Sequence, residues 1–129
     1  MGLACLNPRD AYRRVDFDAL VSSASPEQLV SLCLAQFVAA LGSALAAHER
    51  ADNAAKSQAL TRALSALTAL QMGISSQAGV GRALAHLYEA ARRTLLDNVV
   101  KFDPRAVAIV RDDFRDIASA LGAAKAVAI

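Results

Sequence analysis

The longest uncharged stretch of the chain runs from Gln28 to Ala47 and contains no Asp, Glu, Lys or Arg. It follows Ser25-Pro26-Glu27, a helix-start signal in which the serine serves as N-cap and the proline fits the first helical position. The apolar side chains of this stretch wrap most of the helix circumference, so we expect the helix to be covered on nearly every side. The cover could be lipid, the rest of the chain or a partner.

A membrane span is the first alternative, because about 20 apolar residues match the thickness of a bilayer core. Two features argue against it. Polar residues interrupt the run at Gln28, Ser31, Gln36 and Ser43, and no basic flank precedes Glu27. The N-terminal residues also lack a basic segment followed by an apolar stretch, so no secretory signal is predicted. We therefore expect a cytoplasmic protein without stable membrane insertion.

The composition favours a single helical domain. The chain has 129 residues, of which 55% are hydrophobic, enough for one domain that buries roughly two-thirds of its unfolded surface. Aromatic residues make up only 5%, tryptophan is absent, and strand formers are scarce beside alanine and leucine. Helices are expected throughout.

Periodicity and caps divide the chain into four predicted helices. The first runs from Pro26 to about His48, and the second from about Ala54 to Met72. A glycine- and serine-rich loop then leads to a third helix that starts near Gly81, and Asp103-Pro104 repeats the cap-plus-proline start for a fourth. Because short connections force neighbouring helices to reverse direction, the predicted fold is an all-α antiparallel four-helix bundle.

The inward faces of the last two helices follow from apolar spacing. On helix three the stripe is Leu84, Tyr88, Ala91, Leu95, Asn98 and Phe102, widened toward the core by Leu87, Leu96 and Val99, and on helix four it is Val107, Val110, Phe114, Ile117 and Leu121. We assign residues 1–24 to a loosely held N-terminal arm, 25–124 to the bundle and 125–129 to a C-terminal tail.

Catalytic and nucleic-acid-binding signals are weak. The formal net charge is +2 and the basic residues alternate with acids, so no phosphate-binding stripe is predicted. The Glu-x-x-His pairs of iron-binding bundles are absent, and neither His48 nor His86 has a ligand or base partner at a useful spacing. Cys33 lies among apolar neighbours and is interpreted as a buried free thiol. We expect neither an enzyme nor a metal or other cofactor.

A neutral surface is the most unusual functional feature. No ionisable residue occurs between Ala63 and Gly81, and the predicted outer face of helix two carries Ser57, Thr61, Ser65 and Thr68, where exposed helices usually carry Lys and Glu. Beside the apolar first helix, this small-residue face is suited to form a groove for another helix. The alternative is a low-charge, alanine-rich surface without a partner.

The order of motifs resembles the FliS family of flagellin export chaperones. The matching segments are Ala11-Tyr12, Ser25-Pro26-Glu27-Gln28-Leu29, Leu87-Tyr88-Glu89, Leu95-Leu96-Asp97, Asp103-Pro104 and Val110-Arg111, and the resemblance covers about residues 11 to 121. The chain departs from the family pattern in Leu34-Ala35-Gln36-Phe37, where the family usually has a Tyr-Asp-Gly-Ala type of segment, and in Val99, which replaces a common Asn. These differences leave open a divergent member with another client.

The resemblance implies a cytoplasmic chaperone that binds the C-terminal segment of flagellin, prevents its premature polymerisation and delivers it to the flagellar export apparatus, without nucleotide. The candidate partner-binding residues are Tyr12, Phe17, Leu60, Thr61, Leu64, Thr68, Leu87, Tyr88 and Leu95. The arm around Tyr12 is expected to cover part of the groove until the client binds. The competing hypothesis is a structural or membrane-peripheral bundle that self-associates through its first two helices.

Overall fold

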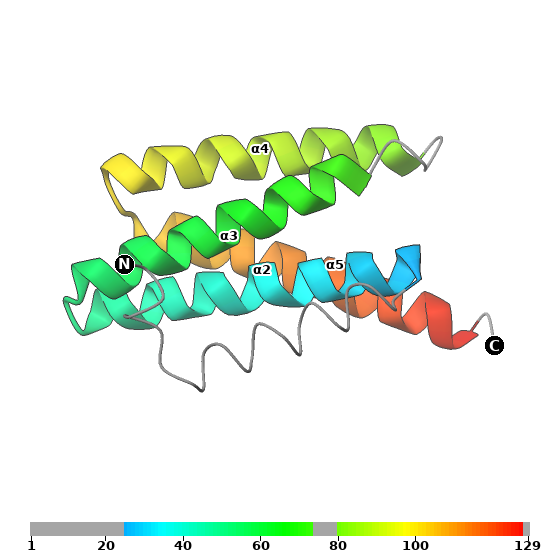
Figure 1. Cartoon of the computed structure of the whole chain (residues 1–129), viewed down its shortest axis with the longest axis horizontal. Helices are drawn as coiled ribbons and strands as arrows, with labels where there is room; N and C mark the ends of the chain where they lie inside the picture. Colours follow the sequence, from blue (N-terminus) through cyan, green and yellow to red (C-terminus); the bar gives the residue numbers. More distant parts are fainter. Residues whose placement is uncertain (1–24, 74–79, 128–129) are drawn as a thin grey trace, which may run out of the picture.

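Four long helices make up the part of the chain that the structure describes. The computed structural model describes residues 25–73 and 80–127, with side chains for 25–73 and 81–122. The helices are α2 (Pro26–Glu49), α3 (Asn53–Gly73), α4 (Val80–Val100) and α5 (Pro104–Val127), and they lie lengthwise beside one another (Figure 1). Both α2 and α4 pack against α3 and α5, so the four neighbours form a closed ring. The predicted all-α antiparallel four-helix bundle is confirmed.

Local caps set two of the helix starts as the sequence predicted. The backbone N–H of Gln28 donates to Ser25 Oγ over 3.2 Å, and the Ser25 N–H donates to Gln28 Oε1 over 2.8 Å. This reciprocal capping box satisfies two donors that would otherwise lack partners at the start of α2. At the start of α5, the N–H of Arg105 donates to Asp103 Oδ1 over 3.0 Å. Both proline-containing starts therefore depend on a side chain that precedes the proline.

A short link reverses the chain between α2 and α3. Ala51 has a positive φ of 56°, in the left-handed region that a non-glycine residue seldom occupies. The Asp52 N–H donates to the Ala47 carbonyl over 2.9 Å, and Asp52 Oδ1 accepts from the Ala55 N–H over 3.0 Å. The link thus closes the end of α2 and caps the beginning of α3 with the same aspartate.

Three aromatic rings from three helices form the centre of the core. Phe37 of α2 lies 4.6 Å from Phe114 of α5, measured between ring centroids, and Tyr88 of α4 lies 5.9 Å from Phe114. Each ring is at most 2% exposed. The predicted inward positions Tyr88 and Phe114 are therefore confirmed, and the rings connect helices that are far apart in the sequence.

Three residues that the sequence placed in the core are instead exposed. Leu96 is 49% exposed, Val99 58% and Leu121 41%. The predicted core face of α4 was too wide, because α4 packs far less extensively against α3 and α5 than α2 does. Only the narrower stripe that contains Tyr88 and Leu95 is buried on α4.

The described residues do not cover the apolar helix α2 on nearly every side, contrary to the expectation from the sequence. It has the length and composition of a membrane span, yet only 28% of its most apolar 18-residue window is buried. Its outward face carries Ala35, Ala39, Ser43 and Ala46, all exposed. These side chains are small, so exposing them costs little free energy while α3 and α5 cover the larger ones.

Some of the segments predicted from the sequence lie outside the residues that the structure describes. Residues 1–24, assigned to the N-terminal arm, and residues 74–79 of the predicted loop are outside the described residues. Helix α5 continues to Val127, within the segment 125–129 that the sequence assigned to a tail. The domain boundaries themselves stay predictions.

Candidate functional site

A groove of about 610 Å³ lies between α2 and α3. The two helices are close where the link joins them and diverge toward Pro26 and Gly73 (Figure 1). The α2–α3 groove occupies this diverging half of the pair. It is lined by Pro26, Leu29, Val30, Leu32, Cys33 and Gln36 from α2 and by Thr61, Arg62, Ser65, Ala66, Ala69, Leu70 and Gly73 from α3.

Alanines explain why the helices are close at one end. Ala40 and Ala44 of α2, together with Ala59 and Ala63 of α3, are between 0% and 5% exposed and lie in the half nearer the link. Small side chains let two helix axes approach closely. Beyond them the sequence of α2 changes to larger side chains, and the helices separate. The groove therefore begins where α2 changes to larger side chains, while α3 contributes the small residues Ala66, Ala69 and Gly73 to its lining.

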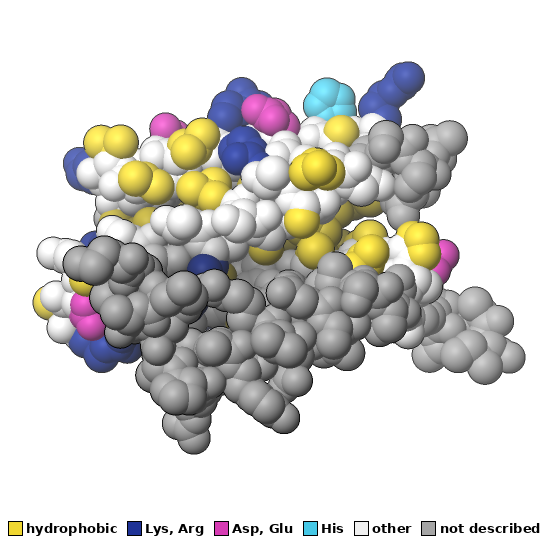
Figure 2. Space-filling model, viewed as in Figure 1, with side chains coloured by type: hydrophobic (Ala, Val, Ile, Leu, Met, Phe, Trp, Pro, Cys, Tyr) yellow, Lys and Arg dark blue, Asp and Glu magenta, His cyan; other side chains and the backbone are white. Residues whose placement is uncertain are grey.

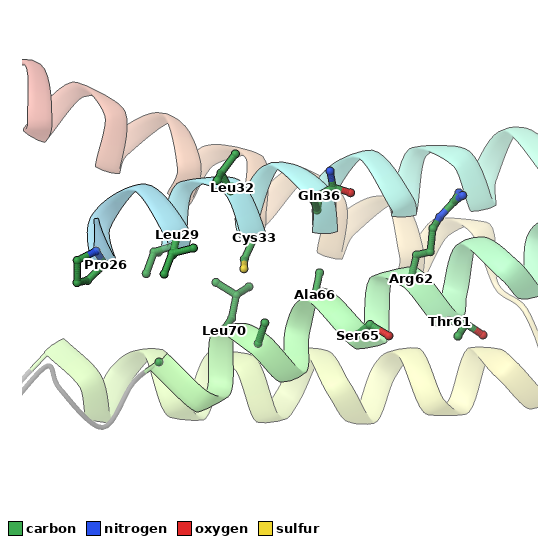
Figure 3. A pocket seen from close by; sticks show the side chains of 13 residues that line it. Pro26, Leu29, Leu32, Cys33, Gln36, Thr61, Arg62, Ser65, Ala66 and Leu70 are labelled. Atoms are coloured by element: carbon green, nitrogen blue, oxygen red, sulfur yellow. The ribbon is translucent and has the colours of Figure 1, made fainter. Parts of the chain in front are cut away.

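The floor and walls of the groove are apolar. Figure 3 shows Leu29 and Cys33 of α2 projecting toward Leu70 of α3 across the gap. Hydrophobic side chains also gather between α2 and α3 in the space-filling view (Figure 2). Burial raises the pKa of the Cys33 thiol, so at neutral pH it is an uncharged part of this wall. Such a surface gains free energy when an apolar partner displaces its water.

Polar groups are confined to the end of the groove near Gln36. The Thr61 hydroxyl donates to the Ser57 carbonyl of the preceding turn over 3.0 Å, so its own helix already satisfies it. Arg62 extends from α3 into the space between the two helices, with Ser65 on the same helix (Figure 3). The groove consequently has an apolar end and a polar end.

Seven of the nine predicted partner-binding residues lie in the described part of the chain, and these seven do not share one surface. Leu60, Tyr88 and Leu95 are 4%, 2% and 0% exposed, so in this conformation their side chains form the core and do not reach a partner. Leu64 and Leu87 are partly buried and pack against that core. None of these five residues lines the groove.

The other four predicted residues have different surroundings. Thr61 is exposed and lines the groove. Thr68 lies at the seam between α3 and α4, where its hydroxyl accepts a hydrogen bond from Arg92. Tyr12 and Phe17 lie outside the described residues. The participation of these residues in binding stays a prediction.

Sequence reasoning placed a groove beside the first two helices but missed most of its lining. The whole α2 wall was absent from the prediction, as were Arg62, Ala66 and Leu70 of α3. A signal was present, because Leu29 and Cys33 fall on the same face of the helix at a spacing of four residues. The sequence does not show that α3 diverges from this face of α2.

The histidines have structural surroundings. The His48 ring lies 4.6 Å from the Phe102 ring, and its Nδ1 is 3.2 Å from Lys56 Nζ, which donates to it. The Lys56 ammonium also lies over the Phe102 ring, 4.7 Å from its centroid. His86 is exposed on α4. Among the described residues, no group of three or more His, Cys, Asp or Glu could hold a metal ion.

Comparison with known proteins identifies the family of this bundle. The family model of the flagellar protein FliS matches residues 8–127. The chain belongs to the FliS family. It is 31% identical over 113 residues to the flagellar secretion chaperone FliS of Salmonella typhimurium strain LT2, an alignment that covers 85% of this chain and 84% of that protein. The resemblance found from the sequence motifs is confirmed, and membership of the FliS family supports a chaperone role in flagellar export.

Proposed function

We propose that this chain is a cytoplasmic export chaperone that binds the C-terminal segment of flagellin in the α2–α3 groove. Binding would shield the apolar face of that segment, prevent premature polymerisation and keep the client ready for the flagellar export apparatus. The role is one of binding and needs neither catalysis nor a cofactor. The observation that carries the proposal is an open apolar groove between two nearly uncharged helices.

The dimensions of the groove suit a short amphipathic helix. The α2 wall from Pro26 to Gln36 spans ten helical steps and the α3 wall from Thr61 to Gly73 spans twelve, or about 15 Å and 18 Å at 1.5 Å per residue. An occupying helix of about three turns would place three apolar side chains in the groove. Burying three such side chains contributes roughly 5–9 kcal/mol, against roughly 2–5 kcal/mol for ordering the client. The surplus must also offset about 4–15 kcal/mol for lost translational and rotational freedom, so three anchors alone would give weak and reversible binding.

The N-terminal arm is included in the proposal as a cover of the groove. Its apolar residues Tyr12 and Phe17 are of a size to occupy apolar surface in the free protein. A client would then have to displace the arm. Removing residues 1–24 should preserve or tighten client binding while leaving the bundle folded, and calorimetry on the full and truncated chains would measure this.

Self-association is the second candidate function. The exposed, uncharged face of α2 with Ala35, Ala39 and Ser43 favours it, because small side chains permit close contact between helices. The two candidates differ in stoichiometry. A chaperone should form a complex of one chain with one client segment, whereas the alternative should form homo-oligomers or bind lipid.

Filling the groove is the direct test. Ala69 lines the groove and is exposed, so Ala69→Trp should block the groove without disturbing the core. Ala90→Trp, at an exposed position of α4 outside the groove, is the matched control. Calorimetric titration with the flagellin C-terminal segment should show at least about tenfold weaker binding for Ala69→Trp alone.

Each other outcome is also decisive. Equal binding by both variants would exclude the α2–α3 groove as the client site. If the unaltered chain does not bind the flagellin segment at all, the chaperone hypothesis for this client is wrong. A concentration-dependent homo-oligomer in sedimentation analysis, combined with no client binding, would instead support the self-associating bundle.

A further inference from the structure

A single positive charge distinguishes the α2–α3 groove. Helix α3 contains no acidic residue, and its only charged side chains are Lys56 and Arg62. Lys56 lies at the link end, against His48 and Phe102. Of the residues that line the groove, only Arg62 is charged. The groove is thus an apolar channel with one cation at its polar end.

Arg62 has no carboxylate partner among the described residues. The ion pairs in the described part of the chain involve Arg50, Arg111 and Arg115, and none involves Arg62. No hydrogen bond of its guanidinium is found there either. By contrast, Arg92 on α4 donates to both Gln71 and Thr68 of α3. An exposed arginine needs no partner, so what distinguishes Arg62 is that it lines an apolar groove without a carboxylate partner among the described residues.

The position of Arg62 disfavours an occupant that carries no negative charge beside it. A segment that fills the groove removes water from the guanidinium, and an unpaired charge loses free energy when it is desolvated. Glu27, the acidic residue at the start of α2, lies nine helical steps from Gln36 and therefore about 14 Å along the axis. It does not form an ion pair with Arg62. Among the described residues no carboxylate is placed to neutralise Arg62, so we expect the occupant to supply the neutralising group.

We infer that Arg62 selects an amphipathic helix that carries one Asp or Glu side chain about two turns from its deepest apolar anchor. The spacing follows from the groove, because Leu70 at the apolar end lies eight residues, or about 12 Å, from Arg62 along α3. Because the lining of the apolar end, around Leu29, Cys33 and Leu70, is uncharged and non-polar, the contact positions of the occupant along that end are apolar or small. This inference rests on the proposed function and specifies which segment of the client occupies the groove.

A charge-swap experiment on the full-length chain tests the pairing. The probe is the C-terminal segment of flagellin from the same bacterium, prepared with an amidated end so that only side-chain carboxylates remain. Arg62→Glu should weaken its binding about tenfold, and Arg62→Gln by about two- to fivefold. One Asp or Glu of the segment, replaced by Lys, should restore binding to the Arg62→Glu chain.

Controls separate pairing from general charge effects. Arg93→Glu makes the same charge change at an exposed position of α4 outside the groove, and it should leave affinity unchanged. Raising the salt concentration should weaken binding to the unaltered chain more than to Arg62→Gln. Circular dichroism should show equal helix content in all variants, because Arg62 is exposed.

The outcomes distinguish this inference from the proposed function. If the unaltered chain binds the segment and Arg62→Glu binds it equally well, the inference is wrong and the chaperone proposal stands. If affinity falls but no single acid-to-Lys change in the segment restores it, the specific pairing is overturned. Loss of binding on amidation alone would show that the terminal carboxylate, and not a side chain, is the partner. Absence of any binding would remove both proposals.

Discussion

The aromatic cluster offers a quantitative test of the core. Phe114 is 1% exposed and lies 4.6 Å from the Phe37 ring and 5.9 Å from the Tyr88 ring. Burial of the side chain accounts for about 1.5–3 kcal/mol. Each ring pair adds about 0.5–1.5 kcal/mol. Because the cavity left by truncation relaxes only in part, Phe114→Ala should lower the free energy of unfolding by about 3–5 kcal/mol.

Urea denaturation followed by far-UV circular dichroism would measure this change, and the melting temperature should fall by about 10–20 °C. Ile109→Ala on the same helix is the matched control, because Ile109 is 57% exposed and its truncation should cost less than about 0.5 kcal/mol. Phe114→Leu keeps most of the volume but removes both ring contacts, so its cost should be intermediate. Equal effects of Phe114→Ala and Ile109→Ala would refute this account of the core.

Three further predictions concern other parts of the bundle. Leu95→Asp places an unpaired charge at a position that is 0% exposed and should lower the free energy of unfolding by about 4 kcal/mol or more. Thr61→Glu, at an exposed position, should change it by less than about 0.5 kcal/mol in the same denaturation assay. Equal losses would contradict the assignment of Leu95 to the inner face of α4 and of Thr61 to the outer face of α3. Ser25→Ala removes the α2 cap and should cost about 1 kcal/mol, an effect that Gln28→Ala should partly reproduce. Burial raises the pKa of the Cys33 thiol and of the Tyr88 hydroxyl above their ordinary values, and the charge of Cys33 adds to the shift of Tyr88. Since the unfolded chain loses these protons first, this stabilisation should be fully present at neutral pH and fall as the pH rises past the ordinary pKa values of a thiol and a phenol; a flat profile in alkaline solution would contradict the shifts.

Local signals made the helices predictable. The starts of α2 and α5 follow from Ser25 and Asp103, whose capping side chains act within three residues of their own position. The predicted ends of α2 and α3 lie within one residue of those observed, whereas α5 continues three residues beyond the predicted limit of the bundle at 124. The neutral surface could also be read, since the absence of charge is visible in the sequence without any knowledge of packing.

The lining of the groove could not be predicted in the same way. Whether an apolar side chain on a helix lies in the core or in a groove depends on the angle between that helix and its neighbour, which no local pattern encodes. Leu60 and Leu95 belong to apolar stripes with the same helical spacing as the apolar residues of the groove, but their side chains face the centre of the bundle. Leu96 and Val99 fit a core stripe, yet α4 packs too loosely to bury them. Long-range geometry decided all four cases.

In the α2–α3 pair, the short link around Ala51 joins two helices whose far ends diverge (Figure 1). Each of the two helices is more than twenty residues long, or about 30 Å. A rotation of about 5° at the pivot would move the far tips apart by about 2.6 Å, close to half the pitch of a helix. Such a rotation would change the separation of the two helices at Pro26 and Gly73 by about the difference in length between an alanine and a leucine side chain. The separation at the closely packed alanines near the link would hardly change. An opening of this size would let the α2–α3 groove accept apolar side chains of different sizes.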